Sequence, residues 1–418
     1  GTSVKLLGSV ADEASLPTDA EEGDLWIAID TGDGWVSDGA GSWTNVGPIQ
    51  GPAGEDGKDS EIPGPKGNDF VYEDFTPEQL EALKGADGTD LLPLNNTWTG
   101  PNNFTAGLYS SGAGSASFRA GSNAGATDQG NNSVAIGYLA GTDTQDYSSV
   151  AVGVSAGQNT QSYSAVAIGN QAAQTSQSSR AVAIGDGAGK DTQGQSAVAI
   201  GNSAGETSQG PYAVAIGIQA GETGQLGYAV ALGIEAGKTD QGQYSVAVGH
   251  EAGVSDQGTN SVAIGNTSGS ITQGDNATAV GRLAGQTSQG LQATAIGYVA
   301  GNDTQGDNAV AIGNSAGQTT QGNNGVAIGY NTAQTNQGAS SVAIGLSAGK
   351  SNQVANAVAI GIYAGTTSQE GQAVAVGYYA GNEAQGADSV SVGREAGRTV
   401  QGSDAVAVGR SSGKTNQG

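Results

Sequence analysis

Two sequence features carry the residue types that catalysis and nucleotide binding require. His250 is the single histidine of the 418-residue chain, so it is the only imidazole that could serve as a general base. The pattern G-x-x-x-G-K-[ST] begins at Gly233, Gly345 and Gly409 and is one residue shorter than a phosphate-binding loop. Because His250 lies in a variable turn position, we expect it to be exposed and without a catalytic role. The three glycine patterns arise from the spacing of a regular repeat, so we expect no nucleotide site.

Acidic side chains offer a third chemistry, the binding of Ca²⁺ between oxygen ligands. Asp143, Asp191 and Asp303 are scattered and lack the G-G-x-G-x-D pattern that spaces such ligands regularly in calcium-binding β-solenoids. A strict repeat presents the same residues many times, whereas a catalytic site needs a few unlike residues that converge. The sequence therefore predicts neither an enzyme nor a resident metal or cofactor, and the elements that matter are those of a fibre.

A 16-residue repeat organises most of the chain and runs over residues 121–418 without insertion or deletion. One glycine recurs in nineteen of nineteen copies, and one glutamine does the same eight residues later. Sixteen residues are too few for a helix and its return, but they fit one coil of a β-solenoid with two short strands and two turns. The fixed positions include Gly121, Gly137 and Gly409 for glycine, and Gln129, Gln145, Gln161, Gln273 and Gln417 for glutamine.

The segment [AS]-V-A-[IV]-G of each repeat alternates as a β-strand does, for example at Val134, Ala135 and Ile136. Residues two apart share a face of a strand, so Val134 and Ile136 are expected to form an apolar face that fills the inside of a thin coil. Ala135 then belongs to a smooth outer face that permits the close approach of a neighbouring chain. The alternative is that this small-residue face meets water.

The invariant glutamine predicts a ladder of side-chain amides. Identical side chains lie above one another when coils stack about 4.8 Å apart, and each amide can donate to the next. We expect a sheltered column from Gln129 to Gln417 that lines the interior of a trimer or the turn beside it. The first glycine of the repeat is expected to need a positive φ. Ala173 and Ala333 replace the second glycine, which indicates tight packing at that position.

Composition agrees with a filament and excludes several classes of protein. The chain has 73 Gly, 5% aromatic residues and no Met or Cys, so a large conventional core, a disulfide framework and a thiolate metal site are excluded. The formal charge of −25 would repel nucleic acid. No apolar run approaches the roughly 20 residues of a membrane span, and no signal peptide opens the chain. The start at Gly1 and the end inside a repeat at Gly418 indicate part of a longer polypeptide.

Residues 1–50 are predicted to form a small β minidomain. Residues 4–10 and 25–29 have the composition of strands, and residues 30–43 are rich in turn residues that predict tight hairpins. Three of the four tryptophans lie here and are interpreted as the core of the minidomain, with a sugar-binding aromatic platform as the alternative. These three are Trp26, Trp35 and Trp43.

Between the minidomain and the repeats the sequence changes character three times. Glycine at every third position is the collagen pattern, which implies three parallel chains. A short helix is expected behind the N-cap residue Thr76, and Trp98 and Phe104 are expected to clamp the register of the chains. In order, the predicted segments are collagen-like triplets over 51–69, the helix and a linker over 70–90, a transition over 91–120 and the repeats over 121–418.

Two resemblances add to this reading. The sequences L-P-T-D-A-E-E-G-D-L-W at residues 16–26 and W-T-N-V-G-P-I-Q-G-P at residues 43–52 resemble the module that precedes collagen-like triplets in bacteriophage tail-fibre proteins. The repeats resemble the head of trimeric autotransporter adhesins, the YadA-like family, whose S-V-A-I-G motif recurs at Ser133, Ser261 and Ser341. The second resemblance implies a trimer of left-handed parallel β-rolls.

The expected fold is an all-β, trimeric parallel β-solenoid shaft preceded by the minidomain, the triplets and one short helix. The leading hypothesis for its function is the rigid shaft of a phage tail fibre at the virion surface. Its expected partners are two further copies, other virion or fibre proteins and a host receptor such as a glycan, bound through an unseen tip, with no nucleic acid and no membrane insertion. The alternative is a bacterial trimeric surface adhesin. Ice binding by the Thr and Ser residues before the glutamine column ranks last, because this array is interrupted at Gly224, Asp240, Asn336, Ala384 and Val400.

Overall fold

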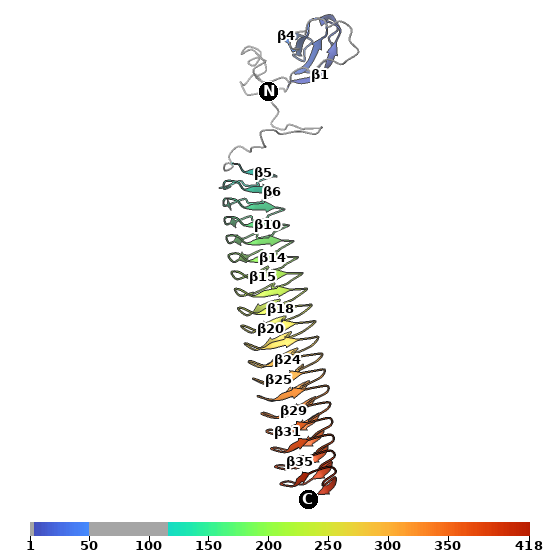
Figure 1. Ribbon diagram of the computed structural model, residues 1–418. Helices are drawn as coiled ribbons and strands as arrows, with labels where there is room; N and C mark the ends of the chain where they lie inside the picture. Colours follow the sequence, from blue (N-terminus) through green and yellow to red (C-terminus); the bar gives the residue numbers. More distant parts are fainter. Residues whose placement is uncertain (1–3, 50–115) are drawn as a thin grey trace, which may run out of the picture. The chain divides into compact units, whose positions relative to one another are not determined.

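The computed structural model describes residues 4–49 and 116–418, which belong to two compact units (Figure 1). The collagen-like triplets, the short helix and the residues Trp98 and Phe104 lie outside the described residues. Within the described ranges, helical structure is limited to the 3₁₀ turn η1 (Glu13–Ser15). No helix in these ranges is long and apolar enough to cross a membrane.

The N-terminal unit is a four-stranded mixed sheet in the order β1-β2-β3-β4. The first two strands are parallel, and the last three form two antiparallel hairpins. The strands predicted over residues 4–10 and 25–29 and the hairpins predicted over residues 30–43 are confirmed. The strands are β1 (Lys5–Val10), β2 (Asp24–Ala28), β3 (Asp33–Ser37) and β4 (Trp43–Pro48).

The tryptophans of this unit border its core. Trp26 and Trp35 lie opposite each other on neighbouring strands, and the rings of both, like that of Trp43, are half-buried. The indole N–H groups of Trp26 and Trp35 are enclosed without a hydrogen-bond acceptor. The interpretation of the tryptophans as the core itself was therefore wrong in part, since the buried apolar side chains are smaller. These are Leu16, Leu25 and Ala28.

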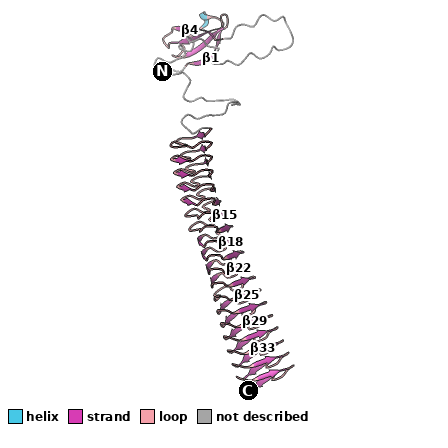
Figure 2. Ribbon diagram, turned by 60° about the vertical axis from the view of Figure 1, so that its left-hand side comes forward, coloured by secondary structure: helices cyan, strands magenta, loops and turns pink. Residues whose placement is uncertain are grey.

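In the second unit, each coil contributes one three-residue strand to a continuous parallel sheet (Figures 1 and 2). The register advances by one repeat at each step, so that Val134 pairs with Val150 and Ala135 pairs with Ala151. The pairing runs from β5 to β37, which confirms the predicted parallel β-solenoid. The strands of this sheet are β5 (Phe118–Ala120), β6 (Val134–Ile136), β8 (Val150–Val152), β10 (Val166–Ile168), β12 (Val182–Ile184), β14 (Val198–Ile200), β15 (Val214–Ile216), β16 (Val230–Leu232), β18 (Val246–Val248), β20 (Val262–Ile264), β22 (Thr278–Val280), β24 (Thr294–Ile296), β25 (Val310–Ile312), β27 (Val326–Ile328), β29 (Val342–Ile344), β31 (Val358–Ile360), β33 (Val374–Val376), β35 (Val390–Val392) and β37 (Val406–Val408).

The other side of the coils is a second stack of two- and three-residue strands that end at the invariant glutamine. It consists of three parallel sheets, and isolated bridges such as Gln193↔Gln209 and Gln289↔Gln305 continue the pairing between them. The strands are β7 (Thr144–Gln145), β9 (Thr160–Gln161), β11 (Ser176–Gln177), β13 (Thr192–Gln193), β17 (Thr239–Gln241), β19 (Ser255–Gln257), β21 (Ile271–Gln273), β23 (Thr287–Gln289), β26 (Thr319–Gln321), β28 (Thr335–Gln337), β30 (Ser351–Gln353), β32 (Thr367–Gln369), β34 (Glu383–Gln385), β36 (Thr399–Gln401) and β38 (Thr415–Gln417).

Alanine and glutamine, rather than valine and isoleucine, fill the interior of each coil. Ala135 is fully buried, whereas Val134 is partly exposed and Ile136 is 37% exposed. The prediction that Val134 and Ile136 fill the coil was therefore wrong, as was the prediction that Ala135 faces outward. The two stacks enclose a thin interior, and the methyl groups of residues such as Ala135 and Ala140 occupy it together with one extended amide per coil.

Both glycine positions of the repeat have a left-handed backbone. Gly137 has a φ of 127°, and a Cβ there would lie 2.4 Å from the carbonyl oxygen of Gly153 in the next coil. The prediction of a positive φ at this position is confirmed, and only glycine fits it. Gly141 has a φ of 53°, and Ala173 adopts 47° at the equivalent position. The interpretation of the second position as packing alone was therefore wrong, because it also requires a positive φ.

Candidate functional site

The side chains with the chemistry of catalysis or metal binding lie apart on the outside of the coils. His250 is half-exposed, and its Nδ1 lies 3.1 Å from Nδ2 of Asn266 in the next coil. The pattern that begins at Gly233 forms a turn, and its Lys238 pairs with glutamates of the surface. Asp143 and Asp303 are exposed. Among residues 4–49 and 116–418, no three His, Asp or Glu side chains gather closely enough to share a metal ion.

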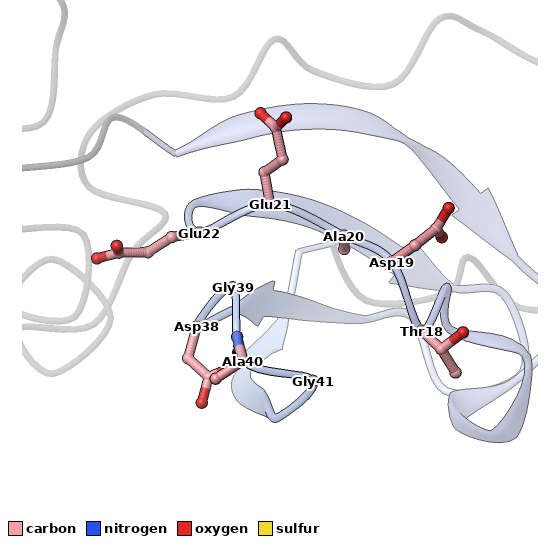
Figure 3. A pocket seen from close by; sticks show the side chains of 9 residues that line it. All are labelled: Thr18, Asp19, Ala20, Glu21, Glu22, Asp38, Gly39, Ala40 and Gly41. Atoms are coloured by element: carbon pink, nitrogen blue, oxygen red, sulfur yellow. Dashed lines mark hydrogen bonds between the residues drawn. The ribbon is translucent and has the colours of Figure 1, made fainter.

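The N-terminal unit has an open hollow of about 670 Å³ lined by residues 18–22 and 38–41 (Figure 3). Figure 3 shows the carboxylates of Glu21 and Glu22 pointing away from each other. The Asp38 carboxylate accepts hydrogen bonds from the backbone N–H groups of Ala40 at 2.8 Å and Ser42 at 2.9 Å, which hold the pKa of Asp38 below its ordinary value. The Asp38 carboxylate thus stabilises a turn, and the hollow has no convergent set of binding groups.

The invariant glutamines form a continuous hydrogen-bonded column. The amide Nε2 of Gln145 donates to the carbonyl oxygen of Val134 at 2.8 Å and to Oε1 of Gln161 at 3.1 Å. The same pair of bonds recurs in each coil from Gln129 to Gln369, whose Nε2 donates to Oε1 of Gln385 at 3.1 Å. Each amide hydrogen therefore has an acceptor, and the side chains point the same way along the column.

The side chains of the glutamine column are sheltered from solvent. Gln145 and Gln161 are fully buried, and Gln273 is 2% exposed. The predicted ladder and its shelter are confirmed over this part of the shaft. Its predicted location at the interior of a trimer was wrong, because the amides lie inside the coil of a single chain. The alternative location beside a turn is confirmed, since the Gln145 amide lies against Gly141 of the turn. The glutamines are the largest fully buried side chains of the described residues. They fill the space between the two stacks of strands, and their hydrogen bonds connect successive coils.

The outward face of the three-residue strands is a long apolar stripe. Each coil from β6 onward adds one Val or Thr and one Ile, Val or Leu to it, and its exposed members include Ile168 at 38%, Leu232 at 43% and Ile264 at 39%. Neighbouring coils cover the flanks of each side chain, because the strands of the sheet pair in register. Soluble monomers rarely expose a contiguous apolar surface of this kind, which is typical of an interaction site.

The turns of the coils carry stacked side chains that sequence reasoning missed. The rings of Tyr212, Tyr228 and Tyr244 lie above one another with centroids 5.0 Å apart at both steps. The guanidinium of Arg394 lies 5.6 Å from the centroid of the Tyr378 ring. The signal was present in the sequence, because each of these neighbours is 16 residues from the next and a period of one coil places them in one column.

Comparison with known families agrees with the repeat. Residues 241–268, 257–284 and 305–332 match the family model of the YadA head domain repeat, which describes two copies of the repeat. These matches cover a minority of the chain and include the S-V-A-I-G motif at Ser261. No curated protein sequence and no solved structure matches the chain. The resemblance of the repeats to YadA-like heads is thus supported, whereas the resemblance to phage tail fibres has no counterpart in these comparisons.

Proposed function

We propose that the chain is the shaft of a homotrimeric fibre on an extracellular surface, in which the apolar stripes of three chains face one another. The observation that supports this most directly is the row of half-exposed aliphatic side chains from Val134 to Val408. Burial of apolar surface contributes about 25 cal/mol per Å² removed from water. A stripe repeated in every coil therefore favours association along the whole shaft.

The interior of the coil supports the same proposal, because it leaves the outer face free for a partner. Ala135 and Gln145 are fully buried, and both hydrogens of the Gln145 amide have acceptors within the chain. The side chains of Val134 and Ile136 therefore lie outside the packed interior of the coil. The trimeric state is inferred from the collagen pattern of residues 51–69 and from the trimeric organisation typical of YadA-like heads.

Two carriers of such a fibre remain as candidates. The YadA head repeats favour a bacterial surface adhesin of the trimeric autotransporter type. The sequence of residues 16–26 and 43–52 favours a phage tail fibre at the virion surface. In either case the proposed role is structural and adhesive rather than catalytic, because the shaft repeats one set of residues in every coil. Labelling of the native source with antibody against the shaft, on intact cells and on purified virions, distinguishes the two carriers.

The trimer is tested by measuring the molar mass of the full chain with light scattering after size exclusion. We expect three times the chain mass of 40.8 kDa. The double variant Val246→Glu and Ile264→Glu places two charges on the stripe and should shift the mass towards that of the single chain. The matched control is Thr272→Glu with Ser288→Glu, two exposed positions on the other stack. A monomeric wild-type chain, or equal effects of the two double variants, would refute the proposed interface.

A further inference from the structure

A compact group of tyrosine and basic side chains lies on the turns that follow β33, β35 and β37. We define the Tyr–Arg cluster as Tyr378, Tyr379, Arg394, Glu395, Arg398 and Lys414. Its members are connected by direct contacts. The rings of Tyr378 and Tyr379 meet edge to face with centroids 4.5 Å apart, and Arg394 and Arg398 lie over them at 5.6 and 4.7 Å. Tyr363 extends the group by stacking on Tyr379 at 4.9 Å.

The arginines of the cluster are oriented and accessible. A guanidinium that lies over an aromatic ring uses its face for that contact, while the N–H groups in its plane remain available for a carboxylate or sulfate. The side chains of Arg394 and Arg398 are 56% and 35% exposed, and that of Lys414 is 45% exposed. The Tyr378 ring beside them is 42% exposed. The cluster therefore offers fixed cationic donors next to an open aromatic surface.

The cluster has more cations than its carboxylate can neutralise. Glu395 accepts from Lys414 at 2.7 Å and lies 3.9 to 4.0 Å from both arginines, so one carboxylate faces three cations. The bond from Lys414 holds the pKa of Glu395 below its ordinary value, which keeps this carboxylate charged. Elsewhere on the shaft the balance is the reverse, since Lys238 faces both Glu222 and Glu235.

Other charges in these coils do not cancel this excess. Arg410 is exposed on the next turn of the same column and adds a fourth cation. Glu383 lies beside Arg398, because its backbone N–H donates to the Arg398 carbonyl oxygen at 2.9 Å, and it leaves four cations against two carboxylates on this side of the coils. Asp388 and Asp404 belong to the opposite turn. A local excess of positive charge is unusual in a chain with a formal charge of −25.

The tyrosines stacked in the cluster occupy a position whose backbone is left-handed throughout the shaft, as at Ser203 and Ser315. Tyr363 and Tyr379 have φ of 56° and 54°, a left-handed conformation that bulky side chains rarely adopt. Most other coils place a small or flexible polar residue at this position, such as Ser203 or Ser315, where no aromatic ring is needed to complete the fold. The left-handed φ thus belongs to the fold, and what distinguishes this part of the shaft is the choice of two bulky aromatic residues at the position.

We propose that the Tyr–Arg cluster binds a short acidic saccharide. The in-plane N–H groups of Arg394 and Arg398 bind its carboxylate or sulfate groups, and the exposed ring of Tyr378 packs against its apolar C–H groups. The cluster spans three coils, about 10–15 Å at the spacing of paired strands, which suits a few sugar units. A long polyanion such as nucleic acid is disfavoured, because the rest of the acidic shaft would repel it.

The test is calorimetric titration of the assembled full chain with three tetrasaccharides of matched length. A heparin-derived probe carries sulfate and carboxylate, a hyaluronan probe carries carboxylate alone, and a maltose-series probe is neutral. We expect the first or the second to bind and the third not to bind. Binding by heparin fragments only assigns sulfate as the recognised group, whereas binding by both acidic probes assigns carboxylate. Equal binding of the neutral probe, no binding of either acidic probe, or tighter binding of a short DNA strand would overturn the proposal.

The variant Arg394→Gln with Arg398→Gln should weaken binding of the acidic tetrasaccharide at least about ten-fold, because it removes both guanidinium groups. The matched control is Arg282→Gln, which removes an arginine that lies over Tyr298 at 5.5 Å outside the cluster and should leave affinity unchanged. Equal losses in both variants, or none in the double variant, would contradict the assignment. The molar mass of each sample is measured as well, so that failure of the trimer and failure of saccharide binding are separate outcomes.

Discussion

The hydroxyl of Ser391 donates a hydrogen bond to the side-chain Oε1 of Gln401, and the glutamine column is interrupted at this step. Ser391 occupies the buried position that alanine holds in the other coils of the repeat. In the coil before it, Nε2 of Gln385 donates to the backbone carbonyl oxygens of Val374 and Ser389. The Ser391 hydroxyl therefore takes the Oε1 acceptor of Gln401, to which the amide of Gln385 would donate if the column continued.

We expect Ser391→Ala to restore the bond between Gln385 and Gln401. The substitution removes a buried hydroxyl and exchanges one hydrogen bond for another, so the gain in stability should be small, about 0.5–1 kcal/mol. The mirror-image variant is Ala375→Ser, which places a hydroxyl in the same relation to Gln385 and should weaken the column there. Hydrogen exchange of the backbone amides in these coils measures both effects. Opposite signs support the relation, and equal signs contradict it.

The middle of the column gives a stronger test. Gln257 donates to Gln273 at 3.1 Å, and Gln273 donates to Gln289 at 2.9 Å. Gln273→Leu leaves a buried donor and a buried acceptor without partners, and each stranded group costs about 1–3 kcal/mol. We expect increased hydrogen exchange in the flanking coils. The control is Gln195→Leu at an exposed position, which should change exchange little, and a comparable increase there would refute the importance of the column.

The sequence predicted the coil, its parallel register and the hydrogen-bonded glutamines, because a repeat without insertions places identical residues above one another. It did not predict which face is inside. Alternation shows that Val134 and Ile136 share a face and that Ala135 has the other, but it does not give the width of the coil. The interior admits methyl groups and one extended amide such as that of Gln145, so the larger aliphatic side chains lie outside. The Tyr–Arg cluster was missed because it occupies variable positions.

Because alanine lies inside the coil, Ala247→Leu should destabilise the single chain itself rather than a contact between chains. Ala247 is fully buried inside its coil, so a larger side chain overpacks the fold of the single chain, at a typical cost of about 1–3 kcal/mol. The same reasoning applies to Ala311. The control is Val246→Leu on the partly exposed outward face. We expect Ala247→Leu to lower the melting temperature more than Val246→Leu does. A larger effect at Val246 would show that the outward face is the more tightly packed of the two.

The two glycines of a coil should differ in their tolerance of alanine. Gly313 has a φ of 129°, and a Cβ there would lie 2.2 Å from the carbonyl oxygen of Gly329, so the backbone of the next coil would have to move. Gly317 has a φ of 51°, and a Cβ there would lie 2.8 Å from Oε1 of Gln321, which is a side-chain atom. The chain itself places alanine at the equivalent residue Ala333, with a φ of 43°.

We therefore expect Gly313→Ala to destabilise the shaft severely, because strain in the backbone adds to a steric clash with a paired strand. Gly317→Ala should cost about 1 kcal/mol, the typical penalty for alanine in a left-handed conformation. Thermal unfolding of both variants and of the reverse change Ala333→Gly provides the comparison. Ala333→Gly should be neutral or slightly stabilising, because glycine relieves the left-handed strain at a cost in chain entropy. If Gly313→Ala and Gly317→Ala have the same melting temperature, the close approach of successive coils at Gly313 does not limit the choice of residue there.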